Sequence, residues 1–300
     1  MSLIINQPAK PRNLIATAIE WLEHGHQVAL ITLVNIEGNA PYPVGSQMLV
    51  KHNGEYSGQI TGGCAETALA EQAIAVIKSG GNTHQRYGLN SPFFDIQLPC
   101  GSGIDVHFDV ETSLTEFKQI HQHLCLRETV KTTLIHSNAT FEKNYQPNER
   151  LIIFGQGAIL ISLAELSLQC GFEVICITPE SKNSEQLLCS GINAHDLQTG
   201  RSLFSGYCDA YTGLVSLFHE HELENTILEE ALSTKLFYIG ALGSKITHAK
   251  RLDVLSKSGL DINLTGKISG PIGIDINART PTQIAISILA EIIEQVPEHA

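Results

Sequence analysis

The chain has 300 residues, of which 43% are hydrophobic, and this is enough for two domains that each bury a core. Its formal net charge of -12 at pH 7 disfavours a nucleic acid as partner, because binding a phosphate backbone depends on neutralising it with Lys and Arg. The N-terminus shows no basic region followed by an apolar stretch, and no apolar run could span a bilayer. We therefore expect a cytoplasmic protein without a membrane partner.

The cysteine pattern points to a reducing compartment. Seven cysteines without a C-x-x-C pair argue against a disulfide framework and against a structural zinc site of the usual spacing. Cys170 and Cys176 lie in apolar runs and are expected to be inert thiols. The three His-x-His pairs lack a third ligand at recognisable spacing, so metal binding by these histidines is not expected.

The first 140 residues read as an α+β domain. Apolar residues recur at helical spacing in three segments and alternate or cluster as in strands in the others. We expect helices over 13–23, 65–77 and 114–126, and strands over 28–34, 47–51, 55–60, 104–108 and 130–136.

Gly62, Gly63 and Cys64 stand between a predicted strand and a predicted helix. Cys64 is expected at or next to the N-cap, where unpaired N–H groups and the helix dipole favour an anion and lower the pKa of a thiol. The alternative is a small core residue, because free cysteine is among the most buried types. The loop over 37–45, which contains two prolines and two glycines, is typical of a shaped binding surface.

Cys100 is a second cysteine in a glycine-rich turn, just before Gly101 and Gly103. It is either a second functional thiol or a turn residue without a role, since the glycines could simply serve a tight backbone geometry. The polar segment over 141–150 is interpreted as a linker. This divides the chain into domains over 1–140 and 141–300.

The second domain has the pattern of a Rossmann-like parallel sheet. A buried strand over 151–154, the turn Gly155-Gln156-Gly157, an apolar helix over 158–169 and a strand over 172–177 follow in order. Gly155 and Gly157 would let backbone N–H groups approach a pyrophosphate at the start of the helix.

Two features of this segment argue against a dinucleotide such as NAD(P). Leu160 occupies the place of the third glycine, where it would crowd the helix against the strand and the ligand. Thr178 and Pro179 stand where an acidic residue would take the ribose hydroxyls, and Glu180 follows two positions late. Nucleotide binding is therefore left open.

Two further segments could hold an anion. Gly243, Ser244 and Lys245 follow a strand predicted over 236–239, and a glycine turn with a hydroxyl and an ammonium can hold a phosphate; the alternative is an ordinary strand-to-helix turn. Arg279 precedes a helix that begins with Thr280, Pro281 and a capping Gln283. Arg279 is thus either an anion clamp or only a neighbour of the cap.

Four strings resemble one known family. EGNAPYPVGSQML (37–49) and GQITGGCAE around Cys64 resemble the N-terminal domain of the xanthine dehydrogenase accessory proteins, the XdhC/CoxI family. YIGALGSKITHAKRL (238–252) and GPIGIDINARTPTQIAISILAEII (270–293) resemble its C-terminal domain. The chain departs from the family at Ala158, where a histidine is common, and near Thr178, where acidic residues are common.

The resemblance implies an accessory protein that binds the molybdenum cofactor, a pterin with a phosphate and two dithiolene sulfurs. It implies protection of this cofactor while a cysteine desulfurase adds the terminal sulfur, and delivery to an apo-molybdoenzyme of the xanthine dehydrogenase type. Carried over residue by residue, it makes Cys64 the foremost candidate metal ligand and Cys100 the second, and a thiolate suits sulfur-loving molybdenum. The phosphate would be taken by helix-mouth residues or a clamp: Gly62, Gly63, Gly155, Gly157, Gly243, Ser244 and Arg279.

An NAD(P)-dependent oxidoreductase, with the first domain as a substrate lid, is the alternative function. The sequence shows no recognisable Tyr/Lys or His/Asp pair that such an enzyme would use for hydride transfer. In a third interpretation, the second domain retains the nucleotide-binding fold only as a docking platform. The sequence thus predicts a maturation factor more than a catalyst, and it leaves open whether two copies form a homodimer.

Overall fold

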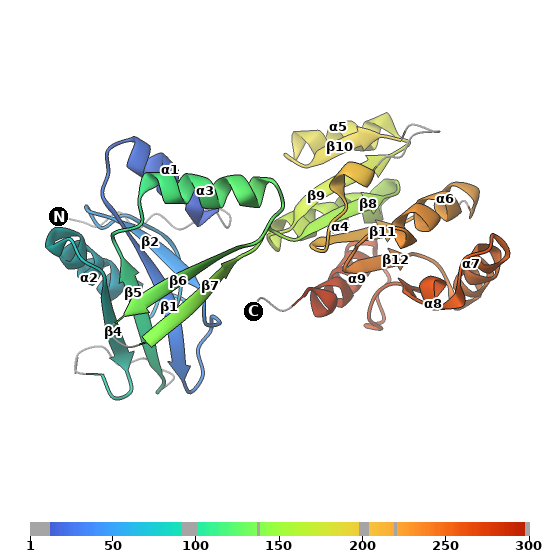
Figure 1. Cartoon of the computed structure of the whole chain (residues 1–300). Coiled ribbons are helices and arrows are strands. Elements are labelled where there is room, and N and C mark those ends of the chain that lie inside the picture. The colour runs from blue at the N-terminus through green and yellow to red at the C-terminus, as the bar shows by residue number, and fades with distance from the viewer. Residues whose placement is uncertain (1–12, 92–100, 137–138, 198–203, 219–220, 298–300) are drawn as a thin grey trace. The chain divides into compact units, whose positions relative to one another are not determined.

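The computed structural model in Figure 1 describes residues 13–91, 101–136, 139–197, 204–218 and 221–297. The chain divides after Pro147 into two compact units. The first unit is α+β and the second is a Rossmann-like parallel-sheet unit, which confirms the predicted fold class. In the described part of the chain no helix combines the length and the apolar character needed to cross a membrane.

The first unit is built on a five-stranded antiparallel sheet with the strand order β3-β2-β1-β5-β4. Side chains alternate between the two faces of a strand, so Ile31 and Leu33 of the first strand enter one core and Val28 and Leu30 enter the other. The strands are β1 (Val28–Glu37), β2 (Gln47–Lys51), β3 (Tyr56–Gly58), β4 (Thr83–Gly88) and β5 (Gly103–Asp109).

Helices cover both faces of this sheet. α2 (Glu66–Ser79) supplies Leu69 and Val76 to the core that contains Ile31. α1 (Leu14–Glu23) and α3 (Leu114–Cys125) supply Trp21 and Phe117 to the core on the other face. All three helices lie within two residues of their predicted limits.

A hairpin of β6 (Val130–His136) and β7 (Ala139–Tyr145) follows α3. The interpretation of 141–150 as a linker is therefore wrong for 141–145, which pair with β6 from Leu134 back to Val130. The physical reason is that β7 lacks a regular apolar alternation of its own, so its conformation is decided by the strand that it pairs with. The hairpin belongs wholly to the first unit.

The predicted binding residues of the first unit follow strands that end at one edge of the sheet. Gly103, the first residue of β5, pairs with both Glu37 and Gly88, the last residues of β1 and β4. The last residue of β3, Gly58, pairs with Met48 near the start of β2. The segments that follow β1 and β3 and that precede β5 therefore leave the same end of the sheet.

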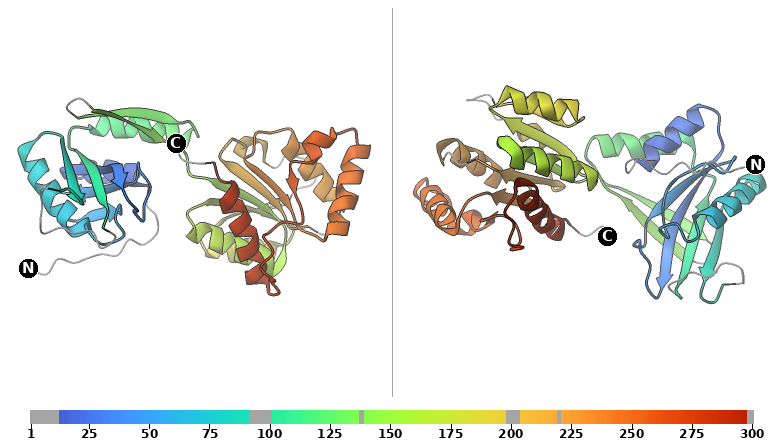
Figure 2. Two further views of the ribbon diagram at one scale, coloured as in Figure 1. Left: turned by 90° about the horizontal axis from the view of Figure 1, so that it is seen from below. Right: turned by 180° about the vertical axis from the view of Figure 1, so that it is seen from behind.

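The second unit is a six-stranded parallel sheet with the order β10-β9-β8-β11-β12-β13, and helices lie on both of its faces (Figure 2). The strands are β8 (Arg150–Phe154), β9 (Glu173–Thr178), β10 (Asn193–Asp196), β11 (Thr212–Ser216), β12 (Tyr238–Ala241) and β13 (Ile268–Ser269). The helices are α4 (Gly157–Gln169), α5 (Ser181–Cys189), the single 3-10 turn η1 (Ser205–Tyr207), α6 (His221–Leu232), α7 (Lys245–Lys257), α8 (Ile262–Thr265) and α9 (Pro281–Gln295).

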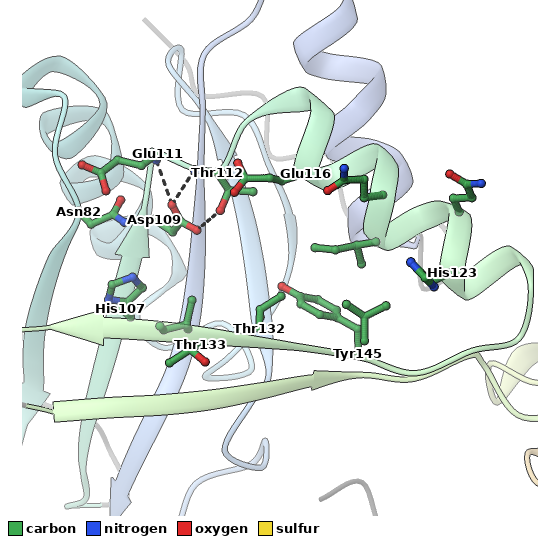
Figure 3. Close-up of a pocket in the computed structure, with 15 residues that line it drawn as sticks. Asn82, His107, Asp109, Glu111, Thr112, Glu116, His123, Thr132, Thr133 and Tyr145 are labelled. Carbon is green, nitrogen blue, oxygen red and sulfur yellow. Dashed lines mark hydrogen bonds between the residues drawn. The ribbon is translucent and has the colours of Figure 1, made fainter.

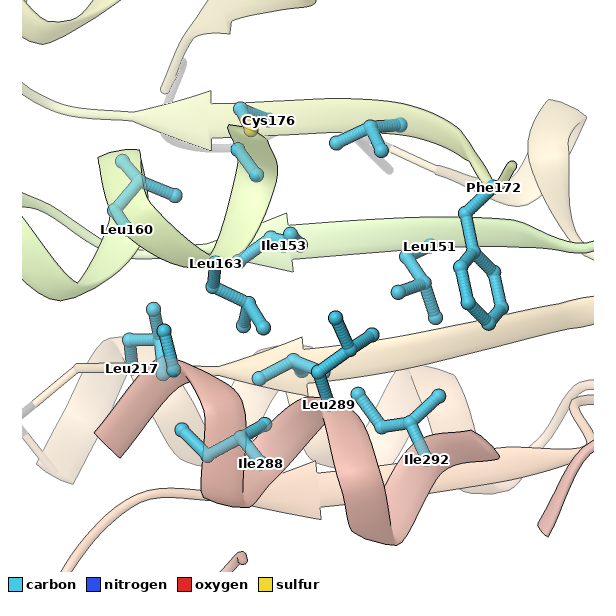
Figure 4. Close-up of a cluster of buried hydrophobic side chains, with 14 of the residues drawn as sticks. Leu151, Ile153, Leu160, Leu163, Phe172, Cys176, Leu217, Ile288, Leu289 and Ile292 are labelled. Carbon is cyan, nitrogen blue, oxygen red and sulfur yellow. The ribbon is translucent and has the colours of Figure 1, made fainter. Parts of the chain in front are cut away.

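Figure 4 shows the core on one face of the parallel sheet, where residues of α4 and α9 gather with residues of β8, β9, β11 and β12. Leu160 of α4 is fully buried in this core with Leu163 and Cys176. The side chain of Leu160 thus fills core volume between α4 and the sheet, at the place where the third glycine of a dinucleotide site would leave the helix closer to the strand.

Candidate functional site

The loop before α2 is organised by the buried carboxylate of Glu66. Its Oε1 accepts hydrogen bonds from the backbone N–H groups of Ile60 (3.0 Å) and Thr61 (2.7 Å), and its Oε2 accepts from Thr61 Oγ1 (2.5 Å). Glu66 is only 2% exposed. Burial alone would raise the pKa of this carboxyl, but the hydrogen bonds from Thr61 and Ile60 outweigh it and hold the pKa below its ordinary value.

Cys64 lies one residue before Ala65, the N-cap of α2, and it is exposed. The predicted place at the helix mouth is confirmed, and the interpretation as a core residue is wrong. Two loop amides beside Cys64 are already used, because the N–H groups of Gly63 (2.8 Å) and Ala65 (3.3 Å) donate to Glu66 Oε2. The first turn of α2 has no side-chain cap, and Cys64 is an accessible thiol at its mouth.

Gly62 borders the loop that follows β1. A Cβ on Gly62 would lie 3.6 Å from Pro41 Cγ and 3.8 Å from Tyr42 Cε2, and its φ of +73° is in the left-handed region. The Tyr42 hydroxyl donates to Gln59 Oε1 at 3.1 Å. The segment that the sequence predicts as a binding surface therefore packs beside the Gly62–Cys64 turn.

Cys100 lies outside the described residues. Gly101 after it adopts a φ of +66°. A Cβ on Gly103 would lie 2.5 Å from Arg86 Nη2, and Arg86 Nη1 pairs with Asp105 Oδ2 at 3.0 Å. Gly103 thus serves a close approach, which agrees with the structural interpretation of this turn.

The predicted glycines of the second unit lie at the carboxyl ends of β8 and β12, two parallel strands on either side of β11. Gly155 follows β8, and a Cβ there would lie 2.7 Å from Cβ of Leu217, the residue after β11. Gly157 begins α4 with a φ of +77°, and the N-cap residue Gln156 makes no side-chain hydrogen bond to the helix. The first N–H groups of α4 are therefore not capped by that side chain and suit an anion.

Gly243 and Ser244 follow β12 at the same edge. Ser244 is the N-cap of α7, and its Oγ accepts from the Thr247 N–H at 3.1 Å and lies 2.9 Å from Thr247 Oγ1. The hydroxyl is thus engaged in capping the helix. This agrees with the interpretation of the side chain as part of an ordinary strand-to-helix turn.

Arg279 is exposed at the mouth of α9, where its backbone N–H donates to Gln283 Oε1 at 3.0 Å within the predicted capping box. Among the described residues its guanidinium has no ion-pair partner. α9 packs along α4, with Thr282 Oγ1 lying 3.3 Å from Ser162 Oγ. Arg279 therefore stands at the same edge of the unit as the turn over 155–157.

The acidic residue after the second strand of the Rossmann-like unit makes a hydrogen bond within its own helix turn. Glu180 is the exposed N-cap residue of α5, and its Oε2 accepts from Asn183 Nδ2 at 2.6 Å. Thr178 Oγ1 accepts from the Glu180 N–H at 3.3 Å. The carboxylate is thus turned to its own helix.

A cavity of about 860 Å³ in the first unit lies between α3, β5 and the β6–β7 hairpin (Figure 3). Its described lining includes the carboxylates of Asp109, Glu111 and Glu116 and contains no Lys or Arg. Asp109 Oδ1 accepts from the N–H groups of Glu111 (2.9 Å) and Thr112 (3.0 Å). None of the predicted site residues lines this cavity, and its charge does not suit a phosphate.

The described cysteines are all free. Cys176 is buried, and burial raises the pKa of its thiol to about 12, as expected of an inert thiol. Cys170, which is also expected to be inert, differs in that it is the C-cap of α4 and is exposed, so burial does not protect its thiol. Within the described ranges, no three His, Cys, Asp or Glu side chains gather as a metal site, so Cys64 stands as a single thiol.

Two residues near the site are not predicted by the sequence analysis. Glu66 carries one signal, an acidic residue in the first turn of a helix. Lys143 of β7 is half-buried, with Nζ 3.3 Å from the place of a Cβ on Gly45 and 5.6 Å from the centre of the Tyr145 ring. Burial lowers the pKa of Lys143. The sequence gives no signal for Lys143, because the segment over 141–150 is interpreted as a linker.

Known proteins resemble both units. The model of the XdhC and CoxI family matches residues 21–88, and the model of the XdhC Rossmann domain matches residues 151–292. The molybdenum cofactor insertion chaperone PaoD of Escherichia coli strain K12 is 31% identical over 94% of this chain and 87% of its own length. A probable xanthine dehydrogenase subunit of Bacillus subtilis is 28% identical over 91% of this chain and 94% of its own length.

A crystal structure of a xanthine dehydrogenase from Bacillus halodurans has the same fold, with a TM-score of 0.75 at 22% identity over 94% of this chain and 95% of that chain. The two matched segments include every predicted site residue except Cys100.

We predict that Glu66→Gln lowers the free energy of unfolding of the first unit by about 2–3 kcal/mol at neutral pH, the value of hydrogen bonds to a buried charge. The folded pKa of Glu66 is lowered, so its contribution is complete above the unfolded pKa of about 4.5 and is lost as the pH falls through the folded pKa. Urea unfolding followed by the fluorescence of Trp21, the only tryptophan, measures this. Glu71→Gln, at an exposed position of α2, is the control. A deficit that stays unchanged as the pH falls from about 7 to about 2 would contradict the assignment.

We also predict that iodoacetamide labels Cys64 in the folded protein and labels Cys176 only after unfolding, because Cys64 is exposed and Cys176 is buried and protonated. Peptide mass spectrometry after brief exposure at graded pH gives the two rates. The prediction fails if Cys64 is protected until the protein unfolds.

Proposed function

Because this chain belongs to the XdhC and CoxI family, we propose that it binds the molybdenum cofactor and assists its insertion into a molybdoenzyme of the xanthine dehydrogenase type. The observation that carries the proposal is the similarity to the insertion chaperone PaoD along 94% of the chain. The similarity includes both units, so it supports a carrier built from the whole chain.

Cys64 is the proposed contact to the metal. Molybdenum that carries sulfur ligands prefers a further sulfur donor, and Cys64 is an exposed thiol in the first unit. The buried Glu66 carboxylate holds the loop of Cys64 through the backbone of Ile60, Thr61 and Gly63. A fixed loop lowers the entropy that is lost when a ligand binds. Cys100 is proposed as the second contact.

The carboxyl edge of the second unit is the proposed place for the phosphate. The first turn of α4, which begins at Gly157, offers N–H groups that the N-cap side chain does not use. Gly155 shapes the turn before it, and its own N–H donates to the carbonyl of Ile177 at 3.1 Å. Arg279 at the mouth of α9 offers an exposed guanidinium, which binds phosphate well because its donors form a planar fork. The backbone of Gly243 and Ser244 lies at the same edge.

We further propose that the protein holds the cofactor while a cysteine desulfurase adds the terminal sulfur. An accessible thiol next to a bound metal centre would shield it from other donors until the sulfur is added. The proposed compartment is the cytoplasm, in which thiols such as the free cysteines described here stay reduced.

An NAD(P)-dependent oxidoreductase is the second candidate, because the strand order of the second unit is the one that binds dinucleotides. Two observations oppose it. Leu160 replaces the third glycine, and the Glu180 carboxylate is bonded to Asn183.

We predict that the protein purified from cells that make the cofactor retains molybdopterin, and that Cys64→Ala lowers the retained amount strongly while Cys125→Ala does not. Cys125 is a matched control because it is an exposed free cysteine of the same unit. Fluorescence of the oxidised pterin measures retention. Equal retention in the two variants would remove Cys64 from the site.

We predict weak or undetectable binding of NAD(H) and NADP(H). Loss of the paired hydrogen bonds to two ribose hydroxyls costs on the order of 1–3 kcal/mol, which weakens binding by roughly ten- to a hundredfold. Calorimetric titration with all four nucleotides is the measurement. A micromolar or tighter dissociation constant for any one of them would favour the oxidoreductase.

A further inference from the structure

A buried ion pair joins α6 and α7 beneath the carboxyl edge of the parallel sheet. Arg251 Nε lies 3.0 Å from Glu224 Oε2, and the two side chains are 0% and 1% exposed. Arg251 Nη2 also donates to Glu224 Oε1 at 3.2 Å. Such pairs are costly to desolvate and are often no more stabilising than apolar residues of the same volume. The main effect of the pair is therefore on the geometry of the groups around it and not on the free energy of unfolding.

The pair ties together the ends of two neighbouring strands. Arg251 Nη2 donates to the carbonyl of Leu242, the residue after β12, at 2.6 Å. Glu224 Oε1 accepts from the hydroxyl of Ser216, the last residue of β11, at 2.9 Å. Arg251 Nη1 lies 3.2 Å from Nδ1 of His248, in the second turn of α7.

The guanidinium lies directly behind the turn over 243–244. A Cβ on Gly243 would lie 3.5 Å from Arg251 Nη2 and 3.1 Å from Thr247 Cβ, and the φ of Gly243 is +150°. Ser244 Oγ is already used to cap α7. What this turn can present to a ligand is thus its backbone, and the carbonyl of Leu242 at its start is held by Arg251.

We propose that Arg251 and Glu224 are positioning residues, which hold the turn over 242–244 in the shape that binds the phosphate of the pterin cofactor. The proposal rests on the proposed function and deepens it, since it assigns a role to two residues that do not touch the ligand. Removal of the Glu224 charge leaves Arg251 buried without its counter-ion, so the guanidinium no longer stays fixed against Leu242.

The same sheet offers a control ion pair at its opposite edge, in which the arginine is 9% and the glutamate 43% exposed. Arg150, the first residue of β8, donates through Nη2 to both carboxylate oxygens of Glu173, the first residue of β9, at 3.0 Å each. This pair joins two strands as well, but at their amino ends. Loss of either pair lowers stability, whereas only the Glu224–Arg251 pair supports the turn over 242–244.

The test compares Glu224→Gln and Glu173→Gln in the full chain, isolated from cells that make the cofactor. Urea unfolding gives the loss of stability, and fluorescence of the oxidised pterin gives retention. We expect Glu224→Gln to lower retention by about tenfold, the effect of losing one net hydrogen bond to the ligand, while Glu173→Gln stays within about twofold of the unmodified chain. Equal retention, or an equal loss in both variants, would overturn the proposal.

Hydrogen exchange without cofactor provides a readout that does not depend on binding. We expect Glu224→Gln to speed exchange in peptides over 242–248 and to leave peptides over 155–160 unchanged. If Glu224→Gln does not fold, Arg251→Lys is used in its place. This variant keeps a positive charge beside Glu224 but replaces the planar guanidinium with a single ammonium group. Unchanged exchange over 242–248 in the folded variant would overturn the positioning role. Absence of pterin from the unmodified chain would instead overturn the proposed function, and the phosphate role with it.

Discussion

The first N–H groups of an α-helix have no partner within the helix, and the candidate sites of this protein are shaped by how each helix meets that constraint. In α2 the carboxylate of Glu66 takes the N–H groups of the preceding loop. In α7 the Ser244 hydroxyl caps the helix, and in α9 the Thr280 hydroxyl does so. The Gln156 side chain makes no such bond to α4. The N-cap residues of α2 and α5 likewise make no side-chain bond to their helices, so α2, α4 and α5 each begin with N–H groups that no N-cap side chain uses.

Each unit also places one buried carboxylate beneath a loop at the edge of its sheet. Glu66 holds the loop of Cys64 through backbone N–H groups, and Glu224 acts on the turn over 242–244 through Arg251. A buried carboxylate is tolerated only when its oxygens are fully bonded, so each one fixes the groups around it. The first unit thus presents an exposed thiol on a loop held by Glu66, and the second holds the turn over 242–244 through Arg251.

The sequence by itself determined the elements whose signals are local. Helix periodicity, the glycines that end a helix and the capping box at Thr280 and Gln283 involve residues a few positions apart, so α1, α2, α3 and α9 could be located without a structure. The strand-turn-helix-strand order after residue 150 likewise determined the Rossmann-like class. The place of Cys64 at the mouth of α2 follows from the same kind of local pattern.

The tertiary structure alone decided the features whose partners are distant in the chain. β7 is a strand because it pairs with β6, although its own residues read as a polar linker. Glu224 and Arg251 meet because α6 and α7 pack together, and neither residue has a sequence pattern that indicates the other. Cys170 is exposed at the C-cap of α4, despite the apolar run before it. Packing, pairing and burial depend on the whole fold, and for that reason no local pattern could predict them.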